Sequence, residues 1–204
     1  MAKTLAETGG AKPRIGIVIS TTREKRFGPV PAQWIYDIAR RRDELDFEII
    51  DLRDYPLPHY GEAGAAGEDA TSQVIARWRA KIASLDGYIF VTAEYNHSIP
   101  GVLKNALDHA YDEYRRKPAA FVGYGGVGGA RAVEQLRLIC IELQMAPLRH
   151  AVHIATEPLL GVKQQGKRLE DYDYLAKSAE TMLDELIWWT YTLRAGRSKA
   201  ATAG

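Results

Sequence analysis

Short apolar runs alternate along the chain with segments in which apolar residues recur at helical spacing. Five runs are rich in Val, Ile, Phe or Tyr, and they cover residues 14–20, 46–52, 86–92, 118–124 and 149–155. The first and third runs are almost continuously apolar, which is typical of strands buried on both faces of a sheet. The pattern therefore predicts five β-strands.

Between and after these runs, apolar residues follow the period of an amphipathic helix. The helical segments are 29–42, 72–84, 101–116, 129–145 and 171–194. Strict alternation of strand and helix predicts a parallel sheet with helices on both faces, because parallel neighbours need crossover connections. Five such strands favour a flavodoxin-like three-layer α/β sandwich with the strand order 2-1-3-4-5.

The chain of 204 residues suits one domain, which we expect to span residues 13–195. The flanking segments 1–12 and 196–204 are small or polar and lack an apolar period, so we expect flexible tails. Residues 56–70 are rich in Gly, Ala and Pro, which predicts a surface or active-site loop.

Composition narrows the classes of function. The formal net charge of +1 argues against binding to nucleic acid or to an acidic membrane surface. No segment approaches the roughly 20 apolar residues of a membrane-spanning helix, and the first residues lack the apolar core of a secretory signal. The single cysteine, Cys140, lies on an apolar stripe and permits no internal disulfide, so we expect an inert core thiol and a cytoplasmic protein.

A ligand of such a sheet binds outside the carboxyl ends of the strands, where the strand order reverses. The loop after the first strand reads STTREKRFGPVP from Ser20 to Pro31. Hydroxyls, arginines and a glycine before a helix start suit a phosphate group, with Arg23 or Arg26 adding a charge-assisted bond. The loop matches neither GxGxxG nor a Walker A motif, and a solvated basic turn is the alternative.

The loop after the fourth strand reads YGGVGGAR from Tyr124 to Arg131. Four glycines in five positions would let a flat aromatic ring lie against the backbone, whereas a flexible turn is the alternative.

The loop after the third strand reads TAEYNHSIPG from Thr92 to Gly101. A catalytic interpretation would make Glu94 a base and His97 an acid, but neighbouring loop side chains rarely converge on one point. The sequence contains no GxSxG, no HExxH and no paired Cys/His spacing, which argues against a nucleophile elbow or a metal site. We therefore expect no catalytic side chain and no metal, and interpret this loop as a backbone cradle.

The segment TAEYNHSIPGVLKNALD (92–108) resembles the corresponding loop and helix of the NAD(P)H-dependent FMN reductase family, whose usual form is T-P-E-Y-N-x-S-x-P-x-x-L-K-N-A-x-D. Ala93 departs from that form by replacing the proline. YGGVGGAR is similar to the family's glycine-rich loop beside the flavin, and STTREKRFG is similar to its phosphate loop. In the latter, Thr21 and Arg23 match the family's serine and arginine, and Arg26 stands where a serine is common.

The resemblance, over residues 14–155, implies FMN as cofactor with NADPH or NADH as co-substrate. Hydride would pass through flavin N5 to a quinone, azo compound, metal oxyanion or free flavin in a ping-pong reaction. Main-chain N–H groups of 94–97 would face N5 and O4, and those of 126–128 would face N1 and O2. The implied cofactor-binding residues are Ser20, Thr21, Arg23, Gly28, Pro29, Val30, Ala93, Glu94, Tyr95, Asn96, His97, Ser98, Gly125, Gly126, Val127 and Gly128.

The family is usually dimeric or tetrameric, so a homodimer or homotetramer is expected. The alternative function is a flavodoxin-like electron carrier or a non-catalytic flavin-binding module without NAD(P)H activity. Such carriers tend to be strongly acidic, and the net charge of +1 argues against one. The sequence does not decide the acceptor, the preferred nicotinamide coenzyme, the tightness of FMN binding or the phosphate donors.

Overall fold

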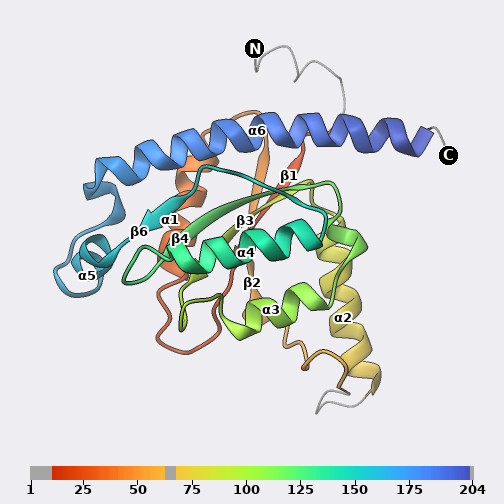
Figure 1. The fold of residues 1–204 in the computed structure, drawn as a ribbon, viewed down its shortest axis with the longest axis horizontal. Coiled ribbons are helices and arrows are strands. Elements are labelled where there is room, and N and C mark those ends of the chain that lie inside the picture. Colours follow the sequence, from red (N-terminus) through yellow and green to blue (C-terminus); the bar gives the residue numbers. More distant parts are fainter. Residues whose placement is uncertain (1–10, 63–67, 203–204) are drawn as a thin grey trace.

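The computed structural model describes residues 11–62 and 68–202. A parallel sheet forms its centre, with the strand order β2-β1-β3-β4-β5 and with β6 also paired to β4 (Figure 1). The strands are β1 (Arg14–Ile19), β2 (Asp46–Asp51), β3 (Gly87–Ala93), β4 (Pro118–Tyr124), β5 (Ala146–Pro147) and β6 (Val152–Ile154). The flavodoxin-like order expected from the sequence is confirmed.

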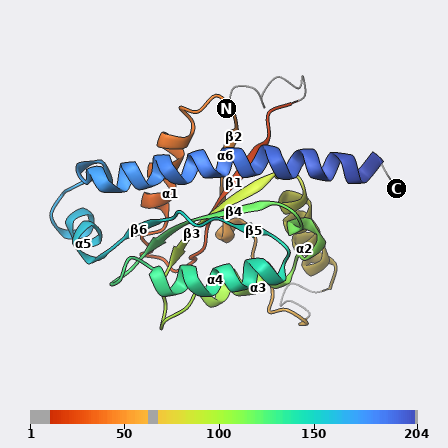
Figure 2. The ribbon, with the colours of Figure 1, turned by 45° about the horizontal axis from the view of Figure 1, so that its top comes forward.

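Helices cover both faces of the sheet (Figure 2). On one face lie α1 (Pro29–Ala39) and α6 (Asp173–Thr202), and on the other lie α2 (Glu68–Ala83), α3 (Gly101–Asp108) and α4 (Ala130–Glu142). Alternate residues of β1 serve the two cores, since Ile15 and Ile17 pack with α1 and α6 whereas Val18 packs with α2 and α3. The three-layer arrangement is therefore built from two separate apolar clusters.

The fifth predicted strand consists of two short pieces. β5 pairs with Pro118 and Ala119, and β6 pairs with Val122 to Tyr124 farther along β4. Pro147 ends β5 and has no N–H to donate to a longer ladder. The predicted range 149–155 therefore holds only three strand residues, Val152–Ile154.

Several helices differ in extent from the sequence pattern. The predicted segment 101–116 contains α3 and then a separate 3-10 helix, η3 (Asp112–Tyr114). The sequence pattern did not predict α5 (Thr156–Gln164) or the 3-10 helices η2 (Leu52–Asp54) and η4 (Leu169–Asp171).

The last helix, α6, continues to Thr202, through most of the segment 196–204 that we expected to be a flexible tail. Its last turns are held by charge, because Arg197 donates to a carboxylate oxygen of Asp86 at 2.6 Å and to the carbonyl of Arg116 at 2.6 Å. Residues 1–10 of the other expected tail, and 63–67 of the predicted loop, lie outside the described residues.

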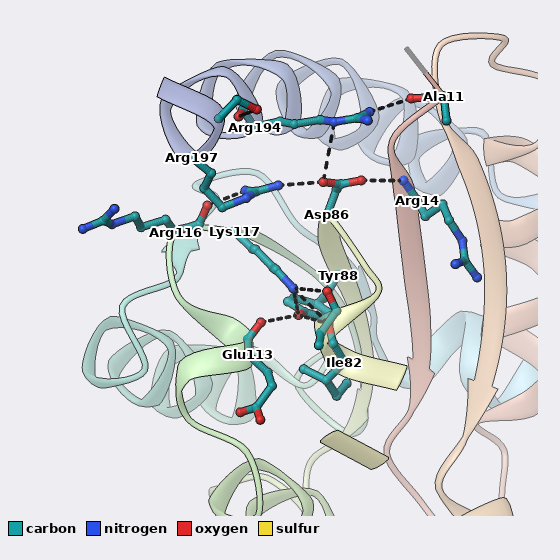
Figure 3. A network of polar contacts seen from close by, with 12 residues as sticks. Ala11, Arg14, Ile82, Asp86, Tyr88, Glu113, Arg116, Lys117, Arg194 and Arg197 are labelled. Carbon is teal, nitrogen blue, oxygen red and sulfur yellow. Dashed lines mark hydrogen bonds and ion pairs between the residues drawn. The ribbon is translucent and has the colours of Figure 1, made fainter. Parts of the chain in front are cut away.

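A buried lysine lies beside these ion pairs at the amino-terminal edge of the sheet (Figure 3). The Lys117 ammonium donates to the carbonyls of Ile82 and Ala83 at 3.0 and 3.1 Å, and to the Tyr88 hydroxyl at 3.3 Å. The two carbonyls belong to the last turn of α2, so Lys117 caps that helix. Burial lowers the pKa of Lys117 to about 8.

Candidate functional site

The three loops singled out in the sequence meet at the carboxyl-terminal edge of the sheet. The hydroxyl of Thr21 lies 3.3 Å from that of Tyr124, which joins the first loop to the end of β4. The N–H of Glu94 donates to the Tyr124 carbonyl at 3.1 Å, which joins the loops after β3 and β4. The guanidinium of Arg23 lies over the ring of Tyr95, 5.7 Å from its centroid. The structure therefore brings the predicted site residues of all three loops into one region.

Residues 95–98 form a tight hairpin turn. The N–H of Tyr95 donates to the carbonyl of Ser98 at 2.9 Å, and the N–H of Ser98 returns the bond at 3.1 Å. The two central residues, Asn96 and His97, have φ values of 47° and 73°, as a type I′ turn requires. A left-handed histidine costs backbone energy, and such outliers cluster at ligand-binding sites.

This turn narrows the expected main-chain donors. The N–H groups of Glu94 and Tyr95 are already engaged within the protein, so they are not available to a ligand. Among the described residues, the N–H groups of Asn96 and His97 have no partner. Of the four N–H groups that we predicted to face the flavin, those of Asn96 and His97 therefore remain available to a ligand.

Glu94 is bound to the start of α4. Its carboxylate accepts the main-chain N–H of Arg131 at 3.2 Å and pairs with the guanidinium of the same residue. The Glu94 side chain is only 5% exposed, and a carboxylate suits the positive end of a helix. Glu94 thus joins the loop after β3 to the start of α4.

Two glycines of the glycine-rich loop are required by the fold itself. Gly128 and Gly129 have φ values of 70° and 68°, which L side chains rarely adopt. A Cβ at Gly129 would lie 2.6 Å from the main-chain nitrogen of Tyr124, and one at Gly128 would lie 2.9 Å from the Cβ of His153. Both glycines therefore let the loop fold back onto β4 and β6.

Gly126 differs from these glycines, because a Cβ there would face open space with its nearest neighbour, the Thr156 hydroxyl, at 4.0 Å. Gly128 uses its N–H in a turn to the carbonyl of Gly125 at 3.0 Å. Within the described part of the chain, the N–H groups of Gly126 and Val127 have no partner. The open side of this loop is therefore formed by Gly126 and Val127.

The first loop presents both buried and exposed groups. Ser20 is fully buried, and its hydroxyl has no hydrogen-bond partner among the described residues. Thr21 is also buried against Tyr124, whose pKa is raised by burial to about 12, so the phenol stays protonated. A Cβ at Gly28 would lie 2.8 Å from the Thr21 hydroxyl, so only glycine fits here.

Helix α1 begins at the predicted point, with Pro29 in its first turn and Val30 exposed beside it. Its N-cap residue, Gly28, supplies no side-chain hydrogen bond to the first N–H groups. Pro29 and Pro31 have no N–H, and the N–H groups of Val30 and Ala32 donate to backbone carbonyls at 2.9 and 3.1 Å, so the first turn of α1 offers no free N–H to an anion. Ala93, the other apolar residue of the expected site, is the last residue of β3 and is buried.

Arg26, one of the two candidate cations, is already paired. Its guanidinium donates to Asp51 at 2.6 Å and to the carbonyl of Thr21, and its side chain is only 7% exposed. Arg23 remains exposed, so it is the arginine of this loop that a ligand would meet. Sequence reasoning missed Asp51 and Tyr124, although each ends an apolar run next to a candidate loop.

The available donors suit a flavin phosphate and the polar edge of a flavin ring, because they are neutral N–H groups, a hydroxyl and the exposed guanidinium of Arg23. Over residues 11–62 and 68–202, no group of three or more His, Cys, Asp or Glu side chains could hold a metal ion. No helix in the same part of the chain is long and apolar enough to cross a membrane.

Known proteins are similar to this chain in sequence and in fold. The family described as NADPH-dependent FMN reductase matches residues 13–158. An NAD(P)H-dependent FMN reductase of Schizosaccharomyces pombe is 36% identical over 153 residues, which is 72% of this chain and 76% of the relative. A 2-hydroxy-1,4-benzoquinone reductase of a Burkholderia species is 28% identical over 189 residues, 86% of this chain and 95% of the relative.

The fold is also found among solved structures. FerB, a flavoenzyme NAD(P)H:(acceptor) oxidoreductase from Paracoccus denitrificans, superimposes with a TM-score of 0.68 at 22% identity. The similarity covers 88% of this chain and 98% of FerB, and it extends the likeness in fold beyond the region matched by the family.

Proposed function

The chain belongs to the NADPH-dependent FMN reductase family and is an enzyme of the NAD(P)H-dependent FMN or quinone reductase type, and from this premise we propose that it binds FMN at the carboxyl edge of its sheet and reduces a small quinone-like acceptor. When bound, FMN supplies the redox chemistry, taking a hydride from a nicotinamide and passing electrons to the acceptor. The residues of the chain bind and orient the reactants.

The observation that carries this proposal is that each of two loops has a pair of main-chain N–H groups without a partner in the described part of the chain. Asn96 and His97 offer free N–H groups on one loop, and Gly126 and Val127 offer free N–H groups on the other. We propose that the first pair donates to the N5 and O4 side of the flavin and the second pair to the N1 and O2 side. Donors near N1 and O2 favour a negatively charged ring electrostatically.

No side chain is needed as a proton donor or acceptor in this proposal. Glu94 is paired with Arg131, and its carboxylate holds the two loops at a fixed separation. The protein contribution is then orientation and electrostatic stabilisation. One binding face serves the nicotinamide and the acceptor in turn, which gives ping-pong kinetics.

A cavity beside the first loop supports a small planar acceptor. Its volume is about 290 Å³, and it lies between Thr22, the 3-10 helix η2 (Leu52–Asp54) and the first turns of α3. Most of its wall is apolar, formed by Leu52, Tyr55, Pro56, Leu57, Val102 and Ala106. An apolar wall with few polar groups is typical of a site for a small organic molecule. Two of the relatives are named as quinone reductases, which agrees with this class of acceptor.

We also propose that the enzyme is a homodimer or homotetramer. Leu138 and Ile141 lie one turn apart on α4 and are 59% and 60% exposed, and Trp188 on α6 is 51% exposed. Exposed apolar residues of this size suit contacts between subunits. Light scattering on the purified protein gives the mass of the assembly, and a fully active monomer would contradict the proposal.

The test of function is spectroscopic. Purified protein mixed with FMN and freed of excess ligand should be yellow, and its absorbance band near ~450 nm should bleach under anaerobic conditions with NADPH or NADH. A quinone added afterwards should restore the band. Colour without bleaching would support the electron carrier, and absence of flavin uptake would contradict both.

A further inference from the structure

Three consecutive carbonyl groups of the first loop are held by two arginines. The guanidinium of Arg26 donates to the carbonyl of Thr21. Arg53 donates through Nε to the carbonyl of Thr22 at 2.9 Å, and through Nη2 to the carbonyl of Arg23 at 2.6 Å. Three adjacent peptide oxygens therefore point to one side, toward the end of β2.

The same contacts also fix the direction in which the N–H groups of these peptides point. In a trans peptide, the N–H of each residue points away from the carbonyl of the residue before it. The N–H groups of Thr22, Arg23 and Glu24 are therefore turned away from the arginines. None of these three groups has a partner among the residues that the structure describes. Successive N–H groups that point to one side form a concavity that binds anions.

Asp51 holds the guanidinium of Arg26 and the backbone of Arg53. One of its carboxylate oxygens lies 2.6 Å from Nη1 of Arg26 and accepts the main-chain N–H of Arg53 at 2.9 Å, and the other oxygen pairs with Nη2 of Arg26. The Arg26 side chain is 7% exposed and that of Asp51 is 23% exposed. Burial would raise the pKa of Asp51, but hydrogen bonds from Arg26 and Arg53 hold it below its ordinary value. A two-pronged, largely buried ion pair fixes geometry strictly.

The first loop resembles the family's phosphate loop, and we propose that Arg26, Arg53 and Asp51 are positioning residues, which orient the N–H groups of residues 22–24 toward the phosphate of FMN without touching it. The proposal rests on the proposed function, because it presumes that FMN is the ligand. It differs from simple charge attraction in the role of Asp51, whose negative charge by itself repels a phosphate.

The two explanations predict opposite changes in FMN affinity for the same substitution. Asp51→Asn removes a negative charge near the phosphate, so charge attraction alone predicts tighter binding of FMN. Positioning predicts weaker binding, because the amide cannot hold both arginines as the carboxylate does. Asp54→Asn is the matched control, since it removes the same charge three residues later. In the described structure Asp54 makes no hydrogen bond to residues 21–23.

The experiment compares FMN with riboflavin, which lacks the phosphate, by titration of flavin fluorescence. For Asp51→Asn and Arg53→Lys we expect the affinity for FMN to fall by about tenfold or more, since each change disturbs hydrogen bonds to a charged group without lowering the positive charge of the loop. The affinity for riboflavin should stay within about twofold, because the ring site is untouched. Asp54→Asn should leave both affinities near the wild-type values.

Each outcome decides the proposal. Tighter or unchanged FMN binding by Asp51→Asn, or an equal loss for both flavins in either variant, would overturn the positioning role. If Asp51→Asn unfolds, Arg53→Lys decides alone, because it keeps the positive charge at a surface position but loses the two donors that hold the carbonyls of Thr22 and Arg23. Failure of the wild-type protein to bind FMN would instead contradict the proposed function, so the two failures are distinguishable.

Discussion

The carboxylate of Glu94, just after β3, accepts the main-chain N–H of Arg131 in the first turn of α4. Two loops that border the proposed flavin site are thus joined by one side chain, which is almost fully buried. The same residue is the first member of the polar run EYNHS, which in the sequence looks like a catalytic cluster. Its contacts in the structure show a carboxylate used to fix the distance between loops.

Replacement of Glu94 tests this role directly. Glu94→Gln keeps an acceptor for the Arg131 N–H and loses only the ion pair, so FMN affinity should fall by less than about tenfold. The rate of flavin reduction by saturating NADPH or NADH, measured by rapid mixing, should stay within about threefold. Glu134→Gln, an exposed change on the same helix, is the control. A loss of about a thousandfold in the reductive step with FMN still bound would restore a catalytic role.

Gly126 and Gly129 should respond in opposite ways to alanine. Gly129→Ala places a Cβ 2.6 Å from a main-chain nitrogen at a positive φ, so it should lower the free energy of unfolding by about 1–3 kcal/mol or more. Gly126→Ala meets no atom closer than 4.0 Å, so thermal unfolding of the flavin-free protein should be unchanged. Its affinity for FMN should nevertheless fall, because the methyl group enters the ring site. If Gly126→Ala binds FMN normally, the ring does not lie against this residue.

Lys117 should make stability depend on pH above neutrality. Burial lowers its pKa in the folded protein to about 8, followed in importance by repulsion from Arg197, while Asp86 and Glu113 act in the opposite direction. The unfolded chain keeps the proton up to about pH 10.5, so between these values it binds more protons and stability rises with pH. From pH 7 to 9.5 the wild type should gain about 1–2 kcal/mol relative to Lys117→Met in urea unfolding.

A flat difference between the two proteins over that range would mean that Lys117 keeps an ordinary pKa. The window ends below pH 10 because tyrosines begin to titrate there. Tyr88, which contacts Lys117, has its pKa raised well above its ordinary value by burial, so its ionisation does not interfere in this window.

The Cys140 thiol should be unreactive in the folded enzyme. It is fully buried in the core beneath α4, and burial raises its pKa far above its ordinary value, so the reactive thiolate is scarce. A chromogenic disulfide reagent at pH 8 should label less than about a tenth of the chains in an hour. In denaturant it should label one thiol in each chain, the number that the sequence contains. Rapid labelling of the native protein would show that α4 opens.

The strand order and the place of the site were predictable because both follow from periodicity. A short, nearly continuous apolar run such as 86–92, rich in aromatic and β-branched residues, is typical of a buried strand, and ligands of this sheet type lie at a defined edge. The tight turn at Asn96 and His97, by contrast, depends on backbone angles that neither residue favours strongly. The sequence therefore predicted where the loop lies, but not which of its N–H groups are free to bind a ligand.

The pairing of Arg26 with Asp51 was not predictable for another reason. The two residues are 25 positions apart, and their contact depends on where β2 ends relative to β1. The register pairs Ile19 with Asp51, and this register places the carboxylate beside the first loop. The sequence offered Arg23 or Arg26 to the ligand, whereas the pairing of Arg26 with Asp51 depends on the register of the sheet.

The extension of α6 illustrates a third limit. Residues after Arg194 lack the apolar stripe by which helices were identified, and the helix is anchored there by Arg197 and Asp86. An ion pair between such distant positions leaves no periodic trace in the sequence. Apolar patterning thus predicts the helices that cover the core and underestimates those held by charge.

The division of the fifth strand into β5 and β6 also governs how copies of this protein can meet. An incoming chain adds to a sheet by pairing with a long, uninterrupted row of N–H and C=O groups, and this border offers two residues, a break and then three. The opposite border, β2, carries the charges of Asp46, Glu48 and Asp51, which also disfavour such growth. We therefore expect an assembly of this enzyme to form through helix faces, with discrete size and without fibrous growth.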